Sequence, residues 1–207
     1  MTLMPVSLLL LILSLLAAPS TQDRPLTIPE ALAHSGGPLT KSVSTPSGPL
    51  PTLDRLLERT GLIVRGIVRG GRSYLSQDEQ DIYTDYEIRN PIVLYDSASP
   101  SPAGRIGTHL TVTILGGEVV VNGTLCKSVH QALPALNPGP EHLLLLRRDG
   151  ERYFLAGTYF GAFRVANGLI EAAANHQEFA ATVNGKSADR MATDLVVAAA
   201  QMHKPRR

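Results

Sequence analysis

"LLLLRRDGERYFLAG", residues 143–157, decides the fold class of this chain. Two β-forming runs flank the dipeptide Asp149-Gly150, and a two-residue hairpin turn needs the positive φ angles that such a dipeptide supplies. The stretch "GAFRVANGLIEAA", residues 161–173, repeats this arrangement around Asn167-Gly168. The sequence therefore predicts two antiparallel hairpins in the second half of the chain.

Short β-forming runs also fill the preceding part of the chain, from Leu62 onward. In "HLTVTIL", residues 109–115, apolar and polar side chains alternate, which is typical of a strand with one buried face. With the hairpins, the runs make about seven or eight strands. Closure into a barrel removes free edge strands, so we expect a mainly β fold with a small antiparallel OB-like barrel. A two-sheet β-sandwich is the alternative. The other runs are "LIVRGIVR" (62–69), "DIYTDYEI" (81–88), which continues through Asn90-Pro91 into "IVLY" (92–95), and "EVVV" (118–121).

Two predicted helices flank the strands. Thr52 is placed to cap a short helix whose leucines share one face, and Ser187 is placed to cap an alanine-rich helix over residues 187–201. We therefore expect a β-barrel domain over residues 52–172, followed by a C-terminal extension over residues 173–207 that contains the second helix.

The first twenty residues have the pattern of an export signal. An apolar run from Val6 to Leu16 is followed by small residues, in the order of the apolar region and cleavage zone of a signal peptide. The run is shorter than the roughly 20 apolar residues that a membrane span needs. We expect a signal peptide over residues 1–20 with cleavage after Ala17 or Ser20. The protein would then be secreted or periplasmic, with membrane contact only during export.

Residues 21–51 separate the predicted signal peptide from the predicted β domain. From His34 onward this segment is built mainly from serine, glycine, proline and threonine, without a periodic apolar pattern. Such a composition is typical of a flexible linker. The sequence therefore predicts a tether between the signal peptide and the barrel.

The composition of the chain narrows the choice of partners. The 207 residues carry a formal net charge of +1, whereas nucleic-acid-binding proteins concentrate unpaired lysine and arginine on one face. The sequence contains no phosphate-binding loop, dinucleotide fingerprint or nucleophile elbow. We therefore expect neither nucleic acid nor a cofactor as a ligand. The expected partner is a protein or glycan outside the cytoplasm.

Cys126 is the single cysteine of the chain, so it cannot close an internal disulfide bond. The structural interpretation is a small buried side chain. The catalytic alternative pairs this thiol with His130 in "CKSVHQ", because a thiol beside an imidazole is a nucleophile pair in some enzymes. No third residue that would orient such a pair is identifiable.

The segment "SYLSQDEQDIYTDYEI", residues 73–88, concentrates carboxylates and tyrosines. One antiparallel register with the strand over residues 62–69 places Arg65 opposite Asp85 and Arg69 opposite Asp81. The same register buries the apolar positions of both strands on one face, which makes it specific. The sequence therefore predicts two structural ion pairs within this hairpin.

These ion pairs leave Asp78 and Glu79 as the candidate carboxylates of a metal site. Calcium takes about six to eight oxygen ligands, and the EF-hand spacing with its central glycine is absent. We therefore expect a solvated hairpin tip and no metal. The exposed tip is also a candidate contact surface, together with an aromatic ring from "AGTYFGAFRV", residues 156–165. The residues of this predicted surface are Tyr74, Gln77, Asp78, Glu79 and Tyr159.

Five segments together resemble a known type of domain: bacterial secreted domains of unknown function that are related in outline to OB-like and netrin-type barrels. The resemblance spans roughly residues 52–172 and implies the fold and export, with no catalytic residue. Protease inhibition by netrin-like proteins depends on an N-terminal cysteine and on disulfide bonds, which this sequence lacks, so that activity is not expected. The segments are "LDRLLERTGLIVRGIVRGGRSYL", "DIYTDYEIRNPIVLYD", "HLTVTILGGEVV", "PGPEHLLLLRRDGERYFLAG" and "GAFRVANG".

Three functional hypotheses follow from the sequence. The first is an exported, non-enzymatic β-barrel module that binds a protein or glycan. The second is an accessory subunit of an envelope assembly that docks through its C-terminal helix. The third, which has the least support in the sequence, is a hydrolase that uses Cys126 and His130.

Overall fold

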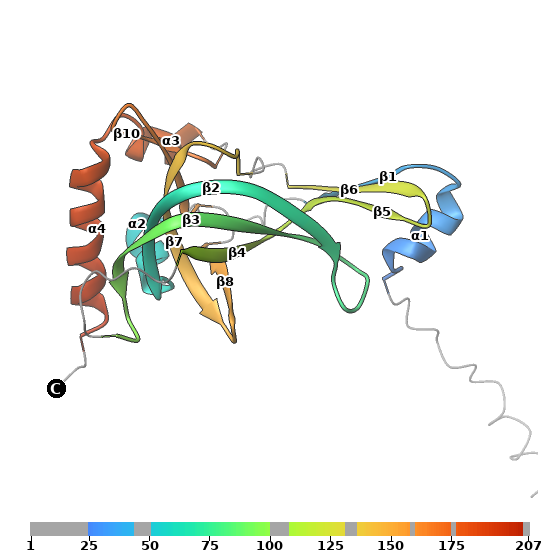
Figure 1. Cartoon of the computed structure of the whole chain (residues 1–207), viewed down its shortest axis with the longest axis horizontal. Coiled ribbons are helices and arrows are strands. Elements are labelled where there is room, and N and C mark those ends of the chain that lie inside the picture. Colours follow the sequence, from blue (N-terminus) through green and yellow to red (C-terminus); the bar gives the residue numbers. More distant parts are fainter. Residues whose placement is uncertain are drawn as a thin grey trace, which may run out of the picture.

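The computed structural model describes residues 25–43, 51–99, 108–130, 136–157, 160–174 and 177–204. The fold is mainly β with helices near both ends of the described chain (Figure 1), so the predicted class is confirmed. Within these residues the larger sheet has seven strands. They are β2 (Leu62–Leu75), β3 (Ile82–Asp96), β4 (His109–Leu115), β7 (Glu141–Asp149), β8 (Arg152–Leu155), β9 (Ala162–Ala166) and β10 (Leu169–Ala172).

Pairing among five of these strands closes a ring. β2 pairs antiparallel with β7 and β3, β3 pairs antiparallel with β4, and β8 pairs antiparallel with β7 and parallel with β4. The β4–β8 contact is a narrow seam of two residue pairs, Val112 with Tyr153 and Thr113 with Phe154. β9 and β10 continue from β7 outside the ring. The narrow parallel seam and the strands outside the ring make the sheet less regular than the small antiparallel OB-like barrel that the sequence predicts.

One edge of β7 is shared by two strands. Residues 141–144 pair with β9 and residues 146–149 pair with β8. Between them, the Leu145 N–H donates to the Gly161 carbonyl over 2.7 Å, and the Ala156 N–H donates to the Leu145 carbonyl over 2.8 Å. A Cβ atom on Gly161 would lie 2.6 Å from the Leu145 carbonyl oxygen, so this close approach requires glycine.

Both predicted hairpins are confirmed. Ala166 pairs with Leu169 around Asn167-Gly168, as the sequence predicts. Asp149 pairs with Arg152, so the turn of the β7–β8 hairpin lies one residue later than predicted. The turn chemistry therefore identifies the hairpins even where it misplaces the turn by a residue.

The register that the sequence predicts for the β2–β3 hairpin is wrong. β2 does not end near Gly70-Gly71 but continues to Leu75, which pairs with Ile82, so the two strands stay paired up to the tip. A side chain at Gly71 would collide with Thr84 and Tyr86, whose side chains cover this glycine from β3. Arg72, and not Arg65, is the register partner of Asp85.

The two ion pairs of the predicted register are consequently not formed. Each of the four side chains has other partners, because the longer hairpin moves the carboxylates of β3 away from the arginines that were expected to face them. The observed partners are Glu141 and Asp189 for Arg65, Glu87 for Arg69, Lys41 for Asp81, and Tyr74 and Thr113 for Asp85.

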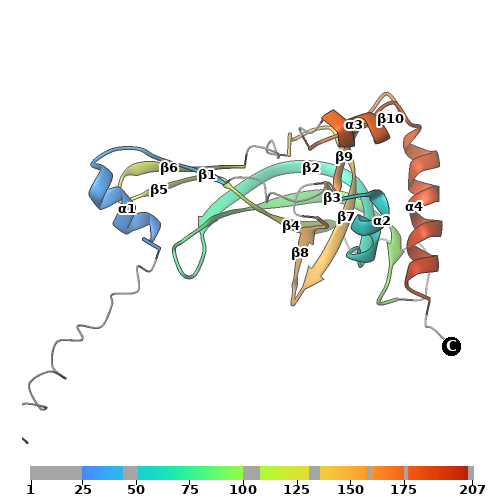
Figure 2. The same ribbon diagram turned by 180° about the vertical axis from the view of Figure 1, so that it is seen from behind.

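A second sheet forms an arm that projects from the hairpin. It contains β1 (Leu39–Val43), β6 (Thr124–His130) and β5 (Gly117–Val121) in that order, and α1 (Ile28–Ser35) packs with it. Figures 1 and 2 show the arm at the end of the molecule opposite the C-terminal helix. The linker predicted over residues 21–51 is therefore wrong for the part that contains α1 and β1.

A helix cap and a small apolar core stabilise the arm. Thr27 and Glu30 form a reciprocal capping box at the start of α1, with the Thr27 N–H donating to Glu30 Oε2 over 2.9 Å. α1 also contributes apolar side chains to a small core that is separate from that of the ring, whose buried members are Ile28, Leu32, Ile82 and Cys126.

The remaining helices are α2 (Leu53–Glu58), α3 (Gln177–Val183) and α4 (Ala188–Met202). Thr52 Oγ1 accepts the Arg55 N–H and so caps α2, and the Ser187 side chain caps α4 in the same way, as the sequence predicts. α2 and α4 pack against each other at one end of the large sheet. Within the described residues, no helix is long and apolar enough to cross a membrane.

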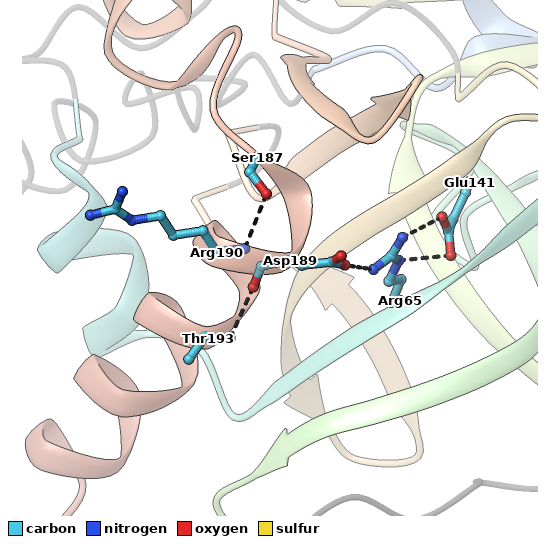
Figure 3. A network of polar contacts seen from close by, with 6 residues as sticks. All are labelled: Arg65, Glu141, Ser187, Asp189, Arg190 and Thr193. Atoms are coloured by element: carbon cyan, nitrogen blue, oxygen red, sulfur yellow. Dashed lines mark hydrogen bonds and ion pairs between the residues drawn. The ribbon is translucent and has the colours of Figure 1, made fainter.

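α4 is held to the ring by apolar packing and by one arginine. Met191 and Leu195 are buried in the main core. Arg65 donates two hydrogen bonds to Glu141, over 2.8 and 2.9 Å, and one to Asp189 in the first turn of α4 (Figure 3). The hydrogen bond to Glu141 is the main reason why the pKa of Arg65 is raised. This arginine therefore connects β2, β7 and α4.

Candidate functional site

The ring strands carry a surface of aromatic and polar side chains on the side of the sheet that faces away from the ring's interior. Along β3 the buried Ile82, Thr84 and Tyr86 alternate with Tyr83 and Asp85, which therefore project from the opposite side. Register pairs carry this side across to β2, β4, β8 and β7. We name this surface the Tyr74 face, and its residues are Tyr74, Tyr83, Asp85, Thr113, Arg147, Arg152 and Phe154.

Hydrogen bonds fix the orientation of the central side chains of the Tyr74 face. Arg152 Nη1 donates to the Tyr74 hydroxyl over 3.0 Å, and this hydroxyl donates to Asp85 Oδ1 over 3.1 Å. The buried Thr113 donates to the same carboxylate oxygen over 2.6 Å. Asp85 thus anchors Tyr74 to β4, and Tyr74 in turn positions Arg152.

Arginine side chains also lie over the aromatic rings of the face. The centre of the Arg152 guanidinium is 5.7 Å from the centroid of the Tyr74 ring, and that of Arg147 is 5.0 Å from the Phe154 ring. The Tyr74 and Tyr83 rings are 6.3 Å apart. These distances are in the range of cation–π and aromatic contacts, so the face combines aromatic rings with arginine side chains, of which Arg147 is also ion-paired with Asp149 over 3.5 Å.

Both tyrosines of the face have raised pKa values. Burial, and then the hydrogen bond to Asp85, raise the pKa of Tyr74. Burial, and then the charge of Asp81, raise the pKa of Tyr83. Both phenols therefore stay protonated at neutral pH. Within the described residues, Arg152 forms no ion pair with a carboxylate, so its charge is available to a ligand.

The predicted hairpin tip has a structural role next to this face. Ser76 Oγ donates to Asp78 over 2.5 Å, and this hydrogen bond is the main reason why the pKa of Asp78 is lowered. The Glu79 carbonyl accepts the N–H of Ile28 over 2.8 Å, which joins the tip to α1. Gln77 is exposed. In the parts of the chain that the structure describes, no three His, Cys, Asp or Glu residues form a group able to hold a metal ion.

The predicted Cys126–His130 pair is not supported by the strand that carries it. The two residues are four positions apart on β6, which separates their Cα atoms by about 13 Å. Cys126 is buried in the arm, and this burial raises the pKa of its thiol, whereas a nucleophilic cysteine needs a lowered pKa. Tyr159, the last residue of the predicted contact surface, lies outside the described residues.

Of the predicted contact residues that the structure describes, only Tyr74 belongs to the Tyr74 face. The sequence interpretation missed Arg147, Arg152 and Phe154. Alternation within the β7–β8 hairpin places these three side chains on one side, and this signal was available in the sequence. Their proximity to Tyr74 was not available, because it depends on the β4–β8 seam between distant segments.

Comparison with known proteins assigns no family to this chain. No family model matches the sequence, and no curated protein matches it. The functional argument therefore rests on the side chains of the Tyr74 face and on their geometry.

Proposed function

We propose that this protein is an exported, non-enzymatic binding module that holds a protein or glycan outside the cytoplasm on its Tyr74 face. The observation that carries this proposal is the pair Tyr74–Arg152, an aromatic ring held in place by Asp85 and an arginine that has no carboxylate partner among the described residues. Tyrosine and arginine are enriched among the residues that dominate binding energy. Because hydrogen bonds already fix these two side chains in the free protein, they lose less conformational entropy when a partner binds.

The Tyr74 face lies on the ring where OB folds bind their ligands, which supports a binding role. In chain order the ring strands are β2, β3, β4, β7 and β8. OB folds bind ligands on the face of their second and third strands and with the loops that join the first to the second and the fourth to the fifth. The corresponding parts here are β3 and β4, the tip at residues 76–81, and the β7–β8 turn next to Arg152. The Tyr74 face lies among these parts.

The alternative of an accessory subunit that docks through its C-terminal helix has less support. The apolar face of α4 packs against the core of its own chain, with Ala188, Met191, Ala192, Leu195 and Ala199 buried. A partner that docked on α4 would therefore meet its other side, where the exposed Val197 and Met202 lie among polar residues.

The binding proposal is tested by crosslinking the full chain in extracytoplasmic extract and measuring the amount of partner recovered. The double variant Tyr74→Ala, Arg152→Ala is expected to recover roughly tenfold less partner, as for the loss of a dominant contact. Arg148→Ala is the matched control, because Arg148 lies in the same hairpin and, among the described residues, donates its hydrogen bond to the Gly150 carbonyl. Equal recovery by the folded double variant and the control would contradict the proposal.

Export is a separate prediction that rests on residues 1–20, which lie outside the described residues. The capping box of α1 starts at Thr27, so cleavage after Ala17 or Ser20 would leave it intact. We expect the protein isolated from the extracytoplasmic fraction to have the mass of a chain that begins at Ala18 or Thr21. Recovery of the uncleaved chain from the cytoplasm alone, measured by mass spectrometry, would be evidence against export.

A further inference from the structure

A cavity lies beside β7, β9 and β10, and its lining residues include none of the Tyr74 face. Its volume is about 160 Å³. Three of its polar side chains form one row across the sheet, because Arg164 is the register partner of His142 on β7 and of Glu171 on β10. The residues that line the cavity are Leu136, Asn137, His142, Arg164, Glu171, Ala172 and Ala173.

His142 is a buried side chain, and one of its ring nitrogens has no hydrogen bond to the residues that the structure describes. Its exposed fraction is 2%. Nδ1 lies 3.1 Å from the Pro140 carbonyl oxygen, and since a carbonyl only accepts, Nδ1 carries the proton. Nε2 then has a free lone pair, and within the described residues it forms no hydrogen bond. Burial, with a smaller effect of the Arg164 charge, lowers the pKa of His142, which keeps the ring neutral.

The walls of the cavity are fixed by backbone hydrogen bonds. The Gly139 N–H donates to the Val68 carbonyl over 2.9 Å, which holds the segment before β7 against β2. The Ala173 N–H donates to the Ala162 carbonyl over 3.0 Å and ties the end of β10 to β9. The small alanine side chains of this wall leave the space that the cavity occupies.

The charges and the size of the cavity define the ligand. Arg164 Nε lies 3.3 Å from Glu171 Oε2, so this ion pair leaves the row without net charge, and a neutral ligand fits it best. The His142 lone pair and the Glu171 carboxylate accept hydrogen bonds, while Arg164 donates them, a combination that hydroxyl groups satisfy. The volume equals about five water molecules and is well below that of a drug-sized site.

We propose that this cavity binds a neutral polyhydroxylated ligand of the size of one monosaccharide, with His142 and Glu171 as hydrogen-bond acceptors and Arg164 as a donor. The proposal does not depend on the Tyr74 face. Either a free sugar or the terminal unit of a glycan has this chemistry.

The test is a titration of the full chain with D-glucose, D-galactose, D-mannose, N-acetyl-D-glucosamine and myo-inositol, with D-glucuronate as the charged comparison. The methyl signals of Ala172 and Ala173, which line the cavity, are followed by NMR. At least one neutral compound is expected to give a saturable shift with a Kd of about 1–10 mM, the range for so small a ligand. No saturation by any neutral compound at about 50 mM, or saturation by D-glucuronate alone, would overturn the proposal.

Substitutions in the cavity test whether the sugar binds there. Arg164→Ala and Glu171→Gln, both at half-exposed side chains, are each expected to weaken binding about fivefold or more, which is the loss of one charged hydrogen bond. Arg190→Ala is the matched control, since Arg190 is an exposed arginine outside the cavity. Unchanged affinity in both cavity variants would show that the sugar binds elsewhere. The Tyr74→Ala, Arg152→Ala variant should retain sugar binding, which separates this proposal from the proposed function.

Discussion

Replacing Gly161 with alanine is expected to lower the melting temperature by about 6–12 °C, which corresponds to a loss of about 3 kcal/mol in the free energy of unfolding. The new Cβ atom would lie 2.6 Å from the Leu145 carbonyl oxygen, 2.8 Å from the Ala156 carbonyl oxygen and 3.0 Å from the Ala156 nitrogen. All three are backbone atoms, which cannot move without breaking the hydrogen bonds that divide β7 between β8 and β9. Thermal unfolding followed by circular dichroism measures this effect.

Gly70→Ala is the matched control for this substitution. Gly70 also lies in a strand, but a Cβ atom there would meet no heavy atom within 4 Å. Its replacement should leave the melting temperature unchanged or raise it by a few degrees, because alanine restricts the unfolded chain. If Gly161→Ala and Gly70→Ala melted alike, the junction at Leu145 would not have the tight packing described above.

Replacing Arg65 with methionine is expected to destabilise the protein by roughly 1–2 kcal/mol. The change removes the bidentate contact to Glu141 and the hydrogen bond to Asp189 at the start of α4 (Figure 3). It also leaves two carboxylates near each other without their shared cation. Thermal unfolding at low salt should show a decrease of about 4 °C in melting temperature.

Arg69→Met is the control for the loss of one positive charge from β2. Arg69 lies on the same strand, is more exposed than Arg65, and approaches Glu87 only to 3.7 Å. Its replacement should have little effect, since exposed ion pairs of this kind contribute little to stability. The difference in melting temperature between the Arg65→Met and Arg69→Met variants should decrease in about 1 M salt. Salt at this concentration screens the repulsion between the carboxylates that remain. A similar melting temperature for both variants would argue against Arg65 as the connection between α4 and the ring.

Local chemistry made much of the fold predictable. The dipeptides at residues 149–150 and 167–168 identify the two hairpins, and Thr52 and Ser187 identify the starts of two helices, because turns and caps depend on a few neighbouring residues. Alternation in residues 109–115 likewise gives the buried side of β4. These features need no knowledge of distant segments.

Features that depend on distant partners were not predictable. Gly70-Gly71 has the composition of a turn, and only the side chains of Thr84 and Tyr86 explain why glycine continues the strand there. The segment before residue 44 has the composition of a linker, yet β1 is ordered because it pairs with β6, far along the sequence. The Tyr74 face was predicted in part, since its arginines reach Tyr74 only through ring closure.

The pairing of β1 with β6 has a consequence for how the protein folds. Pairing Leu39 with Cys126 closes a very long loop and so costs conformational entropy. A small core, with four buried side chains among the described residues, offsets that cost. The arm should therefore form after the ring and open before it, as a unit of low local stability. Cys126 is buried only while the arm is closed, so the protection of this thiol reports the opening of the arm and not the unfolding of the whole protein.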